Sequence, residues 1–336
     1  MEVLCADLCK DIANTLPAIA RREYFEQADK LAFDTGHLVA YNDALAIFQP
    51  LPGSEDIEGV LDGRKLYELL RKIPGTTMVK LIPGEGQLTI QAGRTRSKFA
   101  LAPVLLPLTE IEQSGRYIDV PSDFVKALKL VAGSCAKELS RPVLTCIQFD
   151  QHAIRASDGY RVAEYTFPDH TLPRMLLPAV AAELLVDYEI TQIAVGEVGE
   201  WARFLTAGGG ILCARLKTGL FPDLTGIFEI SGEAIQLPDA LAGSIARALI
   251  FAKREDRLNE EIQVSLRPRQ IVITAQCDGA QFEEVVASPG QTAEARFSIH
   301  PEFLLAALRE GVASCVLDRS AVGFSGESWR HVVALR

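Results

Sequence analysis

Histidine and cysteine are the residues best able to bind a metal or act as nucleophiles, and their spacing here favours neither role. No two histidines have the His-x-x-x-His spacing that puts both rings on one helix face, and no Cys-x-x-Cys pair occurs. The seven cysteines are an odd number, which argues against a disulfide framework and favours a reducing cytoplasm. The histidines lie at 37, 152, 170, 300 and 331, and the cysteines at 5, 9, 135, 146, 213, 277 and 315. We therefore expect no metal ion and no cofactor.

Two glycine-containing segments and one acidic pair are the other candidates for an active site. Pro83-Gly84-Glu85-Gly86 precedes no helical pattern, so it predicts a hairpin turn and not a phosphate-binding loop. Gly208-Gly209-Gly210 lies between two strand patterns and predicts a second turn. Glu283 and Glu284 are neighbours in a predicted strand, where successive side chains point to opposite faces, so they are poorly placed for paired acid–base catalysis. The sequence therefore predicts a protein that is not an enzyme.

Composition narrows the class of protein further. The chain has 336 residues, of which 48% are hydrophobic and 23% charged, as in globular proteins of two or three domains. Its formal net charge of −10 should repel nucleic acid, unless the basic residues gather on one surface. No run reaches the roughly 18 uncharged apolar residues of a membrane span, and the N-terminus lacks a signal-peptide pattern. We expect a cytoplasmic protein without membrane contact.

Helical patterns repeat at nearly constant intervals along the chain. One set opens near residues 7, 121 and 238, which are 114 and 117 residues apart. A second set covers Asp62–Ile73, Leu177–Tyr188 and His300–Glu310, whose starts are 115 and 123 residues apart. Period-two strand patterns lie between and after these helices, so each third is an α+β unit of helix, strands, helix and strands. We predict three similar domains, at 1–115, 116–230 and 231–336, with boundaries near Ile111–Tyr117 and Phe228–Glu233.

Basic residues oppose the apolar stripe in five of the six predicted helices. At 100° per residue they lie 140–220° from a core residue of the same helix. Such faces are usually just solvated, but in an acidic protein their concentration favours one surface that contacts phosphates without reading bases. No aromatic residue interleaves with these helical cations, so stacking on single strands is not predicted. The cations are Lys10, Arg21, Arg64, Arg71, Lys126, Lys129, Lys137, Arg247, Arg254 and Arg309.

Two motifs of the middle repeat resemble a known family. Ala156-Ser157-Asp158-Gly159-Tyr160-Arg161-Val162-Ala163 and Gly219-Leu220-Phe221-Pro222-Asp223-Leu224 resemble segments of the bacterial DNA polymerase sliding clamp, the beta subunit of the replicative polymerase. That family has Ala-Thr-Asp-Gly-His-Arg-Leu-Ala and Gly-x-Phe/Tyr-Pro-Asp-Tyr there. Gln91–Phe99 resembles its first-domain Gly-Arg-x-Arg-Phe strand, and His331–Arg336 resembles its ending. The resemblance covers essentially the whole chain in order.

The resemblance implies a DNA clamp fold and a non-enzymatic function. Three similar domains, each with two helices and antiparallel sheets, form a half-ring, and two chains close head to tail into a homodimeric ring. Helices line the hole, and double-stranded DNA passes through it, held topologically for processivity. By this resemblance Arg22 joins Arg21 among the DNA-facing residues.

The resemblance also implies an apolar groove between the second and third domains. Polymerases and clamp-loader subunits insert a linear peptide there. The matching positions are Leu144, Ser157, Gly159, Tyr160, Arg161, Val162, Pro222, Ile227, Val333, Leu335 and Arg336.

Ring closure requires complementary edges. Phe99 and Leu101 match the apolar positions of the first-domain edge strand, and Ile250 and Phe251 match the apolar pair across the joint. Arg94, Arg96 and Lys98 on one edge are expected to meet Glu283 and Glu284 on the other.

Several positions depart from the family pattern and alter the floor of the groove. Tyr160 replaces His, Ser157 replaces Thr, Leu224 replaces Tyr, and Val333-Ala334-Leu335 replaces Met-Pro-Met. This divergence suggests a phage, plasmid or accessory copy. The alternative to a sliding clamp is a clamp-like scaffold that binds peptides but does not encircle DNA, and an enzyme on a repeated α+β fold is the third hypothesis.

Overall fold

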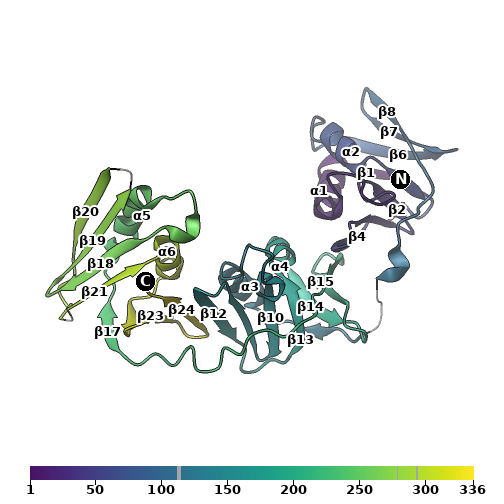
Figure 1. Ribbon diagram of the computed structural model, residues 1–336. Coiled ribbons are helices and arrows are strands. Elements are labelled where there is room, and N and C mark those ends of the chain that lie inside the picture. The colour runs from purple at the N-terminus through teal and green to yellow at the C-terminus, as the bar shows by residue number, and fades with distance from the viewer. Residues whose placement is uncertain (112–114, 278, 293) are drawn as a thin grey trace. The chain divides into compact units, whose positions relative to one another are not determined.

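The computed structural model describes residues 1–111, 115–277, 279–292 and 294–336 and combines helices with antiparallel sheets (Figure 1). The chain divides into two compact units: unit 1 is Met1–Lys129 with Leu172–Thr218, and unit 2 is Leu130–Thr171 with Gly219–Arg336. The α+β class is confirmed. The three domain boundaries stay predictions, and the first falls partly on residues 112–114, outside the described residues.

The long sheet of unit 1 joins segments that are far apart in sequence. Strand β4 pairs with β16, with Ile47 opposite Leu212. Tyr41 and Trp201 are fully buried beside this joint, with ring centroids 6.1 Å apart. In spatial order the strands are β5 (Gly59–Leu61), β2 (Leu31–Asp34), β3 (His37–Tyr41), β4 (Leu45–Pro50), β16 (Ile211–Arg215), β15 (Trp201–Thr206), β14 (Ile190–Val195) and β9 (Ile118–Asp119). Gly208–Gly210 forms the predicted turn between β15 and β16.

In the short sheet of unit 1, successive side chains along each strand alternate between a buried face and an outward face. Val79, Leu81, Leu88 and Ile90 cover the buried face. The strands follow in the order β1 (Glu2–Leu4), β6 (Met78–Gly84), β7 (Gln87–Ala92) and β8 (Thr95–Ala100), which leaves β8 as an open edge. The hairpin predicted at Pro83–Gly86 joins β6 to β7.

The helices begin and end where local chemistry requires. Helix α1 (Cys5–Thr15) buries Leu8 and Ile12 and stops before Pro17, which has no N–H to continue the ladder. In α2 (Gly63–Leu70) the Asp62 carboxylate accepts the Lys65 N–H at 2.9 Å, an N-cap. The other helices of the first two thirds are α3 (Phe124–Ala132) and α4 (Ala179–Leu185), which follows β13 (Leu172–Pro178).

Unit 2 has the same kind of construction. Its long sheet runs β10 (Cys146–Gln151), β11 (Ala153–Ser157), β12 (Arg161–Thr166), β24 (Trp329–Ala334), β23 (Ala321–Ser325), β22 (Ser314–Leu317) and β17 (Glu233–Gln236). Its short sheet runs β20 (Ala280–Ala287), β19 (Gln270–Cys277), β18 (Ile262–Arg267) and β21 (Ala295–Ile299), with β20 as an open edge. Helices α5 (Ala240–Ala252) and α6 (Pro301–Leu308) complete the unit.

The helices are shorter than predicted, which corrects part of the helical-wheel argument. Arg21 follows the 3-10 helix η1 (Leu16–Ala18), Lys137 lies beyond the end of α3 at Ala132, and Arg254 lies beyond Ala252. Arg71 and Arg309 are C-cap residues of α2 and α6. No helix in the described part of the chain is long and apolar enough to cross a membrane.

Candidate functional sites: a groove and two open sheet edges

A groove of about 580 Å³ lies within unit 2. One wall is the 3-10 helix η3 (Pro142–Thr145) with the turn at Asp158–Arg161, and the other is η4 (Arg257–Asn259) with the start of α6. Four predicted groove residues line it: Leu144, Gly159, Tyr160 and Arg161. The lining residues that sequence reasoning missed include Cys135, Lys137, Arg141, Arg257, His300 and Phe303.

The turn at Asp158–Arg161 is self-contained. One Asp158 carboxylate oxygen accepts the N–H groups of Tyr160 and Arg161, both at 3.0 Å, and the other accepts Arg161 Nε at 2.9 Å. The Ser157 hydroxyl donates to the Arg161 carbonyl at 3.0 Å and accepts the Gly159 N–H at 3.1 Å. Gly159 has φ +90°, a backbone conformation that residues with a Cβ rarely adopt. The motif therefore fixes Tyr160 and Arg161 at the groove.

A stack of three side chains forms part of the groove wall. The Arg161 guanidinium lies 4.0 Å from the centroid of the Phe303 ring. The His300 ring stacks on Phe303 at 4.0 Å and 16°, and its Nε2 lies 2.8 Å from the Arg257 carbonyl oxygen. Burial lowers the pKa of His300, so at neutral pH the imidazole is uncharged and Nε2–H donates to that carbonyl. This part of the wall therefore consists of two stacked aromatic rings and the Arg161 cation, which suits an apolar ligand with a few polar groups.

The register of β24 places Val333 on the same face of the sheet as Arg161. Ser157 pairs with Val162, and Val162 pairs with Val332, so these three side chains share one face of the sheet. Val333 pairs with Arg161 on the opposite face and is fully buried. Val333 thus shares its face with the groove-lining Arg161 but is buried, and neither Val333 nor Ser157 nor Val162 lines the cavity.

His331 lies in the core beneath the groove, on the same face as Arg161. Its side chain is 2% exposed, and its Nε2 has no hydrogen-bond partner within the described chain. Burial first, and then the charge of Arg161, lowers the pKa of His331 to about 3. The imidazole is therefore neutral across the physiological range.

Arg336 has a positioning role in the groove wall. Its backbone N–H donates to Ser298 at 2.9 Å, and its guanidinium donates to the carbonyls of Leu258 and Glu260. Leu258 belongs to η4, so Arg336 holds that wall instead of lining the cavity. The Leu335 N–H donates to the Ser320 carbonyl at 2.8 Å, and Leu335 does not line the cavity either.

Pro222 and Ile227 belong to a segment that covers the other face of the long sheet. Pro222 lines a separate cavity of about 340 Å³, and Ile227 is exposed on the same segment. Beneath it Glu164, 2% exposed, accepts Arg155 Nε at 2.5 Å and Arg330 Nε at 3.0 Å. This ion-pair cluster anchors the segment, because the Arg330 guanidinium also lies 4.6 Å from the centroid of the Phe228 ring.

The open edge at β8 presents different chemistry on its two faces. Arg96 and Lys98 pair with Gln91 and Thr89 on the outward face, whereas Phe99 pairs with Leu88 on the apolar face. Phe99 and Leu101 line a cavity of about 880 Å³, together with Val60, Leu61 and Leu69. Arg94 lies in the turn before β8 and is exposed. The edge is therefore basic outward and apolar inward.

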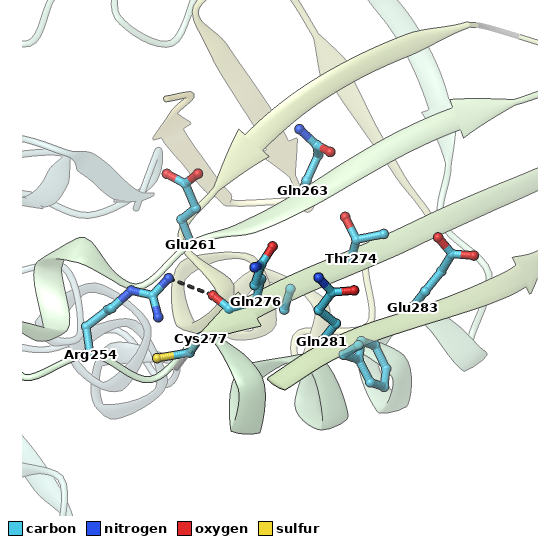
Figure 2. A pocket seen from close by; sticks show the side chains of 10 residues that line it. Arg254, Glu261, Gln263, Thr274, Gln276, Cys277, Gln281 and Glu283 are labelled. Atoms are coloured by element: carbon cyan, nitrogen blue, oxygen red, sulfur yellow. Dashed lines mark hydrogen bonds between the residues drawn. The ribbon is translucent and has the colours of Figure 1, made fainter. Parts of the chain in front are cut away.

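The open edge at β20 has complementary chemistry. Glu283 pairs with Thr274 on the outward face, and Figure 2 shows it at a cavity of about 810 Å³ over β18, β19 and β20. Phe282 lies on the inward face, stacked on Phe251 at 5.4 Å. Ile250, on the neighbouring helix α5, is 66% exposed. This edge therefore carries Glu283 on its outward face and the Phe282 ring on its inward face.

Glu284 corrects the expected charge pairing. It faces inward from β20 and accepts both Nε and Nη2 of Arg247, at 2.8 and 2.5 Å. The Arg247 side chain holds the pKa of Glu284 below its usual range. Glu284 is thus engaged within its own unit, and Arg247, expected to face DNA, is neutralised by it.

The remaining predicted cations differ in their availability. Lys10, Lys126 and Lys129 are exposed and form no ion pair among the described residues. Arg64 donates to the Ile19 carbonyl at 2.5 Å, and Arg254 donates to the Gln276 carbonyl at 2.7 Å, drawn as the dashed line in Figure 2. No group of three or more His, Cys, Asp or Glu side chains within the described ranges is placed to hold a metal ion.

Solved structures of bacterial sliding clamps have the same fold. The chain matches the sliding clamp (DNA polymerase III subunit beta) of Pseudomonas aeruginosa bound to griselimycin with a TM-score of 0.86 and 17% identity, covering 100% of this chain and 98% of that one. It matches the DNA polymerase beta subunit of Streptococcus pyogenes with a TM-score of 0.85 and 14% identity (100% and 99% covered). It matches the sliding clamp of Bacillus subtilis with a TM-score of 0.79 and 18% identity (100% and 98% covered). No protein-family model and no curated protein sequence matches this sequence. The predicted clamp fold is confirmed.

Proposed function

We propose that this protein is a DNA sliding clamp: two copies close head to tail into a ring that encircles duplex DNA and tethers a polymerase and clamp-loader subunits. The observation that carries the proposal is the complementarity of the two open sheet edges, in a chain whose fold is shared from end to end with sliding clamps. An edge strand with unpaired N–H and C=O groups is a template for pairing with another chain.

The two edges match on both faces. When β8 of one copy lies beside β20 of another, Arg96 and Lys98 lie on the same outward face as Glu283. On the inward face Phe99 and Leu101 meet Phe282. The exposed Ile250 side chain enters the cavity beside β8 and is thereby removed from contact with water. Such a head-to-tail contact closes when two copies form the ring.

Solution mass tests ring closure. We expect about 73 kDa by light scattering across a dilution series, twice the 36.6 kDa of one chain. Ile250→Asp should give monomers, whereas Val180→Asp, at an equally exposed valine on α4, should leave the dimer intact. Lys98→Glu and Glu283→Lys should each weaken the dimer, and the double variant should recover it. A wild-type monomer at every concentration, or no recovery in the double variant, would contradict this interface.

We further propose that Lys10, Lys126 and Lys129 form weak, mobile contacts to phosphates in the ring. The ring should remain on nicked circular DNA during gel filtration and leave once a nuclease linearises the circle. Lys126→Glu with Lys129→Glu should reduce the retained fraction, whereas Lys80→Glu, on the outward face of β6, should not. Equal loss from circular and linear DNA would favour the peptide-binding scaffold.

The groove in unit 2 is proposed to hold the linear peptides of polymerase and clamp-loader subunits. Its buried Leu144, its half-exposed Tyr160 and the Arg161–Phe303 stack provide the apolar and polar contacts that peptide anchoring uses. Peptides selected from a random library should lose affinity with Phe303→Ala. We propose no catalytic role and no cofactor, a cytoplasmic location, and three domains at 1–115, 116–230 and 231–336.

A further inference from the structure

A loop in unit 1 presents an exposed aromatic ring beside two cations. Arg21, Arg22 and Tyr24 lie in the irregular segment between η1 and β2, although Arg21 was predicted to belong to the first helix. The Tyr24 side chain is 62% exposed. Among the predicted helical cations Arg71 has an aromatic neighbour, because its guanidinium lies 5.6 Å from the centroid of the half-buried Tyr67 ring, contrary to the prediction. In this loop the aromatic ring is exposed.

Tyr24 is held in place with its ring available. Its hydroxyl donates to the Asn42 carbonyl oxygen, so its polar group is already satisfied by the protein. Its ring meets Phe25 edge-to-face at 5.1 Å and 86°, and Phe25 packs at 5.5 Å on the fully buried Tyr41. The exposed surface that remains is the apolar ring, pre-positioned on the core.

The acidic residues of this loop do not neutralise its arginines. Arg21 and Arg22 are exposed and make no ion pair in the described part of the chain. The Glu23 carboxylate accepts the Gln27 N–H at 2.9 Å. Glu23 and Glu26 both line the cavity beside β8, which neither arginine lines. The loop thus separates a cationic and aromatic part from an acidic part.

We infer that this loop binds single-stranded DNA by stacking an unpaired base on Tyr24 while Arg21 and Arg22 contact the adjacent phosphates. Every base has a π-face, so stacking accepts any sequence. In a duplex the base faces are already stacked on one another, so Tyr24 contributes only where a base is unpaired. The inference extends the proposed function, because it adds a contact to single strands that encirclement of duplex DNA does not supply.

The test compares a fluorescent ten-nucleotide oligo(dT) with a duplex of equal length, both by anisotropy with the full chain. Tyr24→Ala should weaken oligo(dT) binding on the order of tenfold, the lower part of the range for loss of one base–aromatic stack. Tyr24→Phe should stay close to wild type, because the ring remains. Duplex affinity should be the same in all three proteins. Arg21→Glu with Arg22→Glu should weaken both ligands.

Tyr67→Ala is the matched control, because Tyr67 is a half-buried aromatic whose ring is covered by Arg71 at 5.6 Å. It should bind oligo(dT) as wild type does. Wild-type affinity in Tyr24→Ala, equal weakening in Tyr24→Phe, or a parallel loss on duplex would each overturn the inference. Retention on circular DNA is measured separately, in the wild type and in Tyr24→Ala. If the wild type is not retained, the clamp proposal fails, whereas a Tyr24-dependent contact to single-stranded DNA would still stand.

Discussion

Acid should unfold unit 2 chiefly through His331, and His331→Leu should remove most of that sensitivity. The imidazole is 2% exposed, and burial together with Arg161 lowers its pKa to about 3. Above pH 6.5 the ring is neutral in both folded and unfolded chains, so it adds no pH dependence. Below pH 6.5 the imidazole of His331 binds a proton in the unfolded chain but stays neutral in the folded chain. Stability is therefore lost as the pH falls from about 6.5 towards 3.

The magnitude follows from the difference between the two pKa values. A shift from 6.5 to about 3 corresponds to about 5 kcal/mol when complete, at about 1.4 kcal/mol for each pH unit. Between pH 7.5 and pH 5, where most carboxylates stay ionised, the loss is about 2 kcal/mol. His300 has a pKa lowered in the same direction, so a smaller dependence should persist in His331→Leu.

Trp329 is a built-in reporter for this experiment. Its ring lies 5.6 Å from His331, and the sequence has one other tryptophan, Trp201, which belongs to unit 1. Urea unfolding followed by fluorescence in a Trp201→Phe background therefore reports on unit 2. The urea midpoint of the parent should fall between pH 7.5 and pH 5, and that of His331→Leu should fall much less. His170→Asn, at an exposed histidine, is the control and should behave as the parent.

Two results would refute this reasoning. One is a parent and a His331→Leu variant whose midpoints fall in parallel between pH 7.5 and pH 5. The other is an imidazole Cε1–Hε1 resonance of His331 that titrates near pH 6.5 in the folded protein, since a buried neutral ring should show no such titration.

Three further outcomes follow from single positions. Gly159→Ala should lower stability by about 1–3 kcal/mol in urea titrations, because its φ of +90° strains any Cβ, whereas Gly86→Ala, at +65° with open space around it, should cost less. Glu164→Gln leaves two guanidiniums without their shared carboxylate and should cost about 2 kcal/mol, against less than about 0.5 kcal/mol for Glu2→Gln in its exposed pair. Burial raises the pKa of Cys213 to about 12, so peptide mapping should find this thiol unalkylated at pH 8 until the protein unfolds.

Features set by local chemistry were predictable from the sequence. The hairpin at Pro83–Gly86, the turn at Gly208–Gly210 and the opposite orientations of Glu283 and Glu284 all depend on neighbouring residues and strand periodicity. The clamp fold was expected from the resemblance of two short motifs, Ala156–Ala163 and Gly219–Leu224, to a known family. The structure agrees with these predictions.

Features set by contacts between distant segments were not predictable. Val333 shares a face with Arg161 because β12 pairs with β24 across about half the chain, and period two cannot supply that register. Arg247 meets Glu284 because α5 packs on β20, which places a predicted DNA contact and a predicted interface residue on each other. Helix ends fall between these cases: α1 ends at Thr15, just before Pro17, whereas Arg21 was predicted to lie on that helix.

The pairing of β4 with β16 has a consequence for how the chain is made. Ile47 leaves the ribosome 165 residues before its partner Leu212 (212 − 47). At roughly 5–20 residues per second, β4 waits roughly 8–33 s as an unpaired strand edge. During that time the nascent chain exposes the unpaired edge of an incomplete sheet, which can pair with another chain. Synthesis is thus a period of aggregation risk, and a pause in translation before residue 212 would lengthen it, whereas a holding chaperone that covers β4 would shorten its exposure.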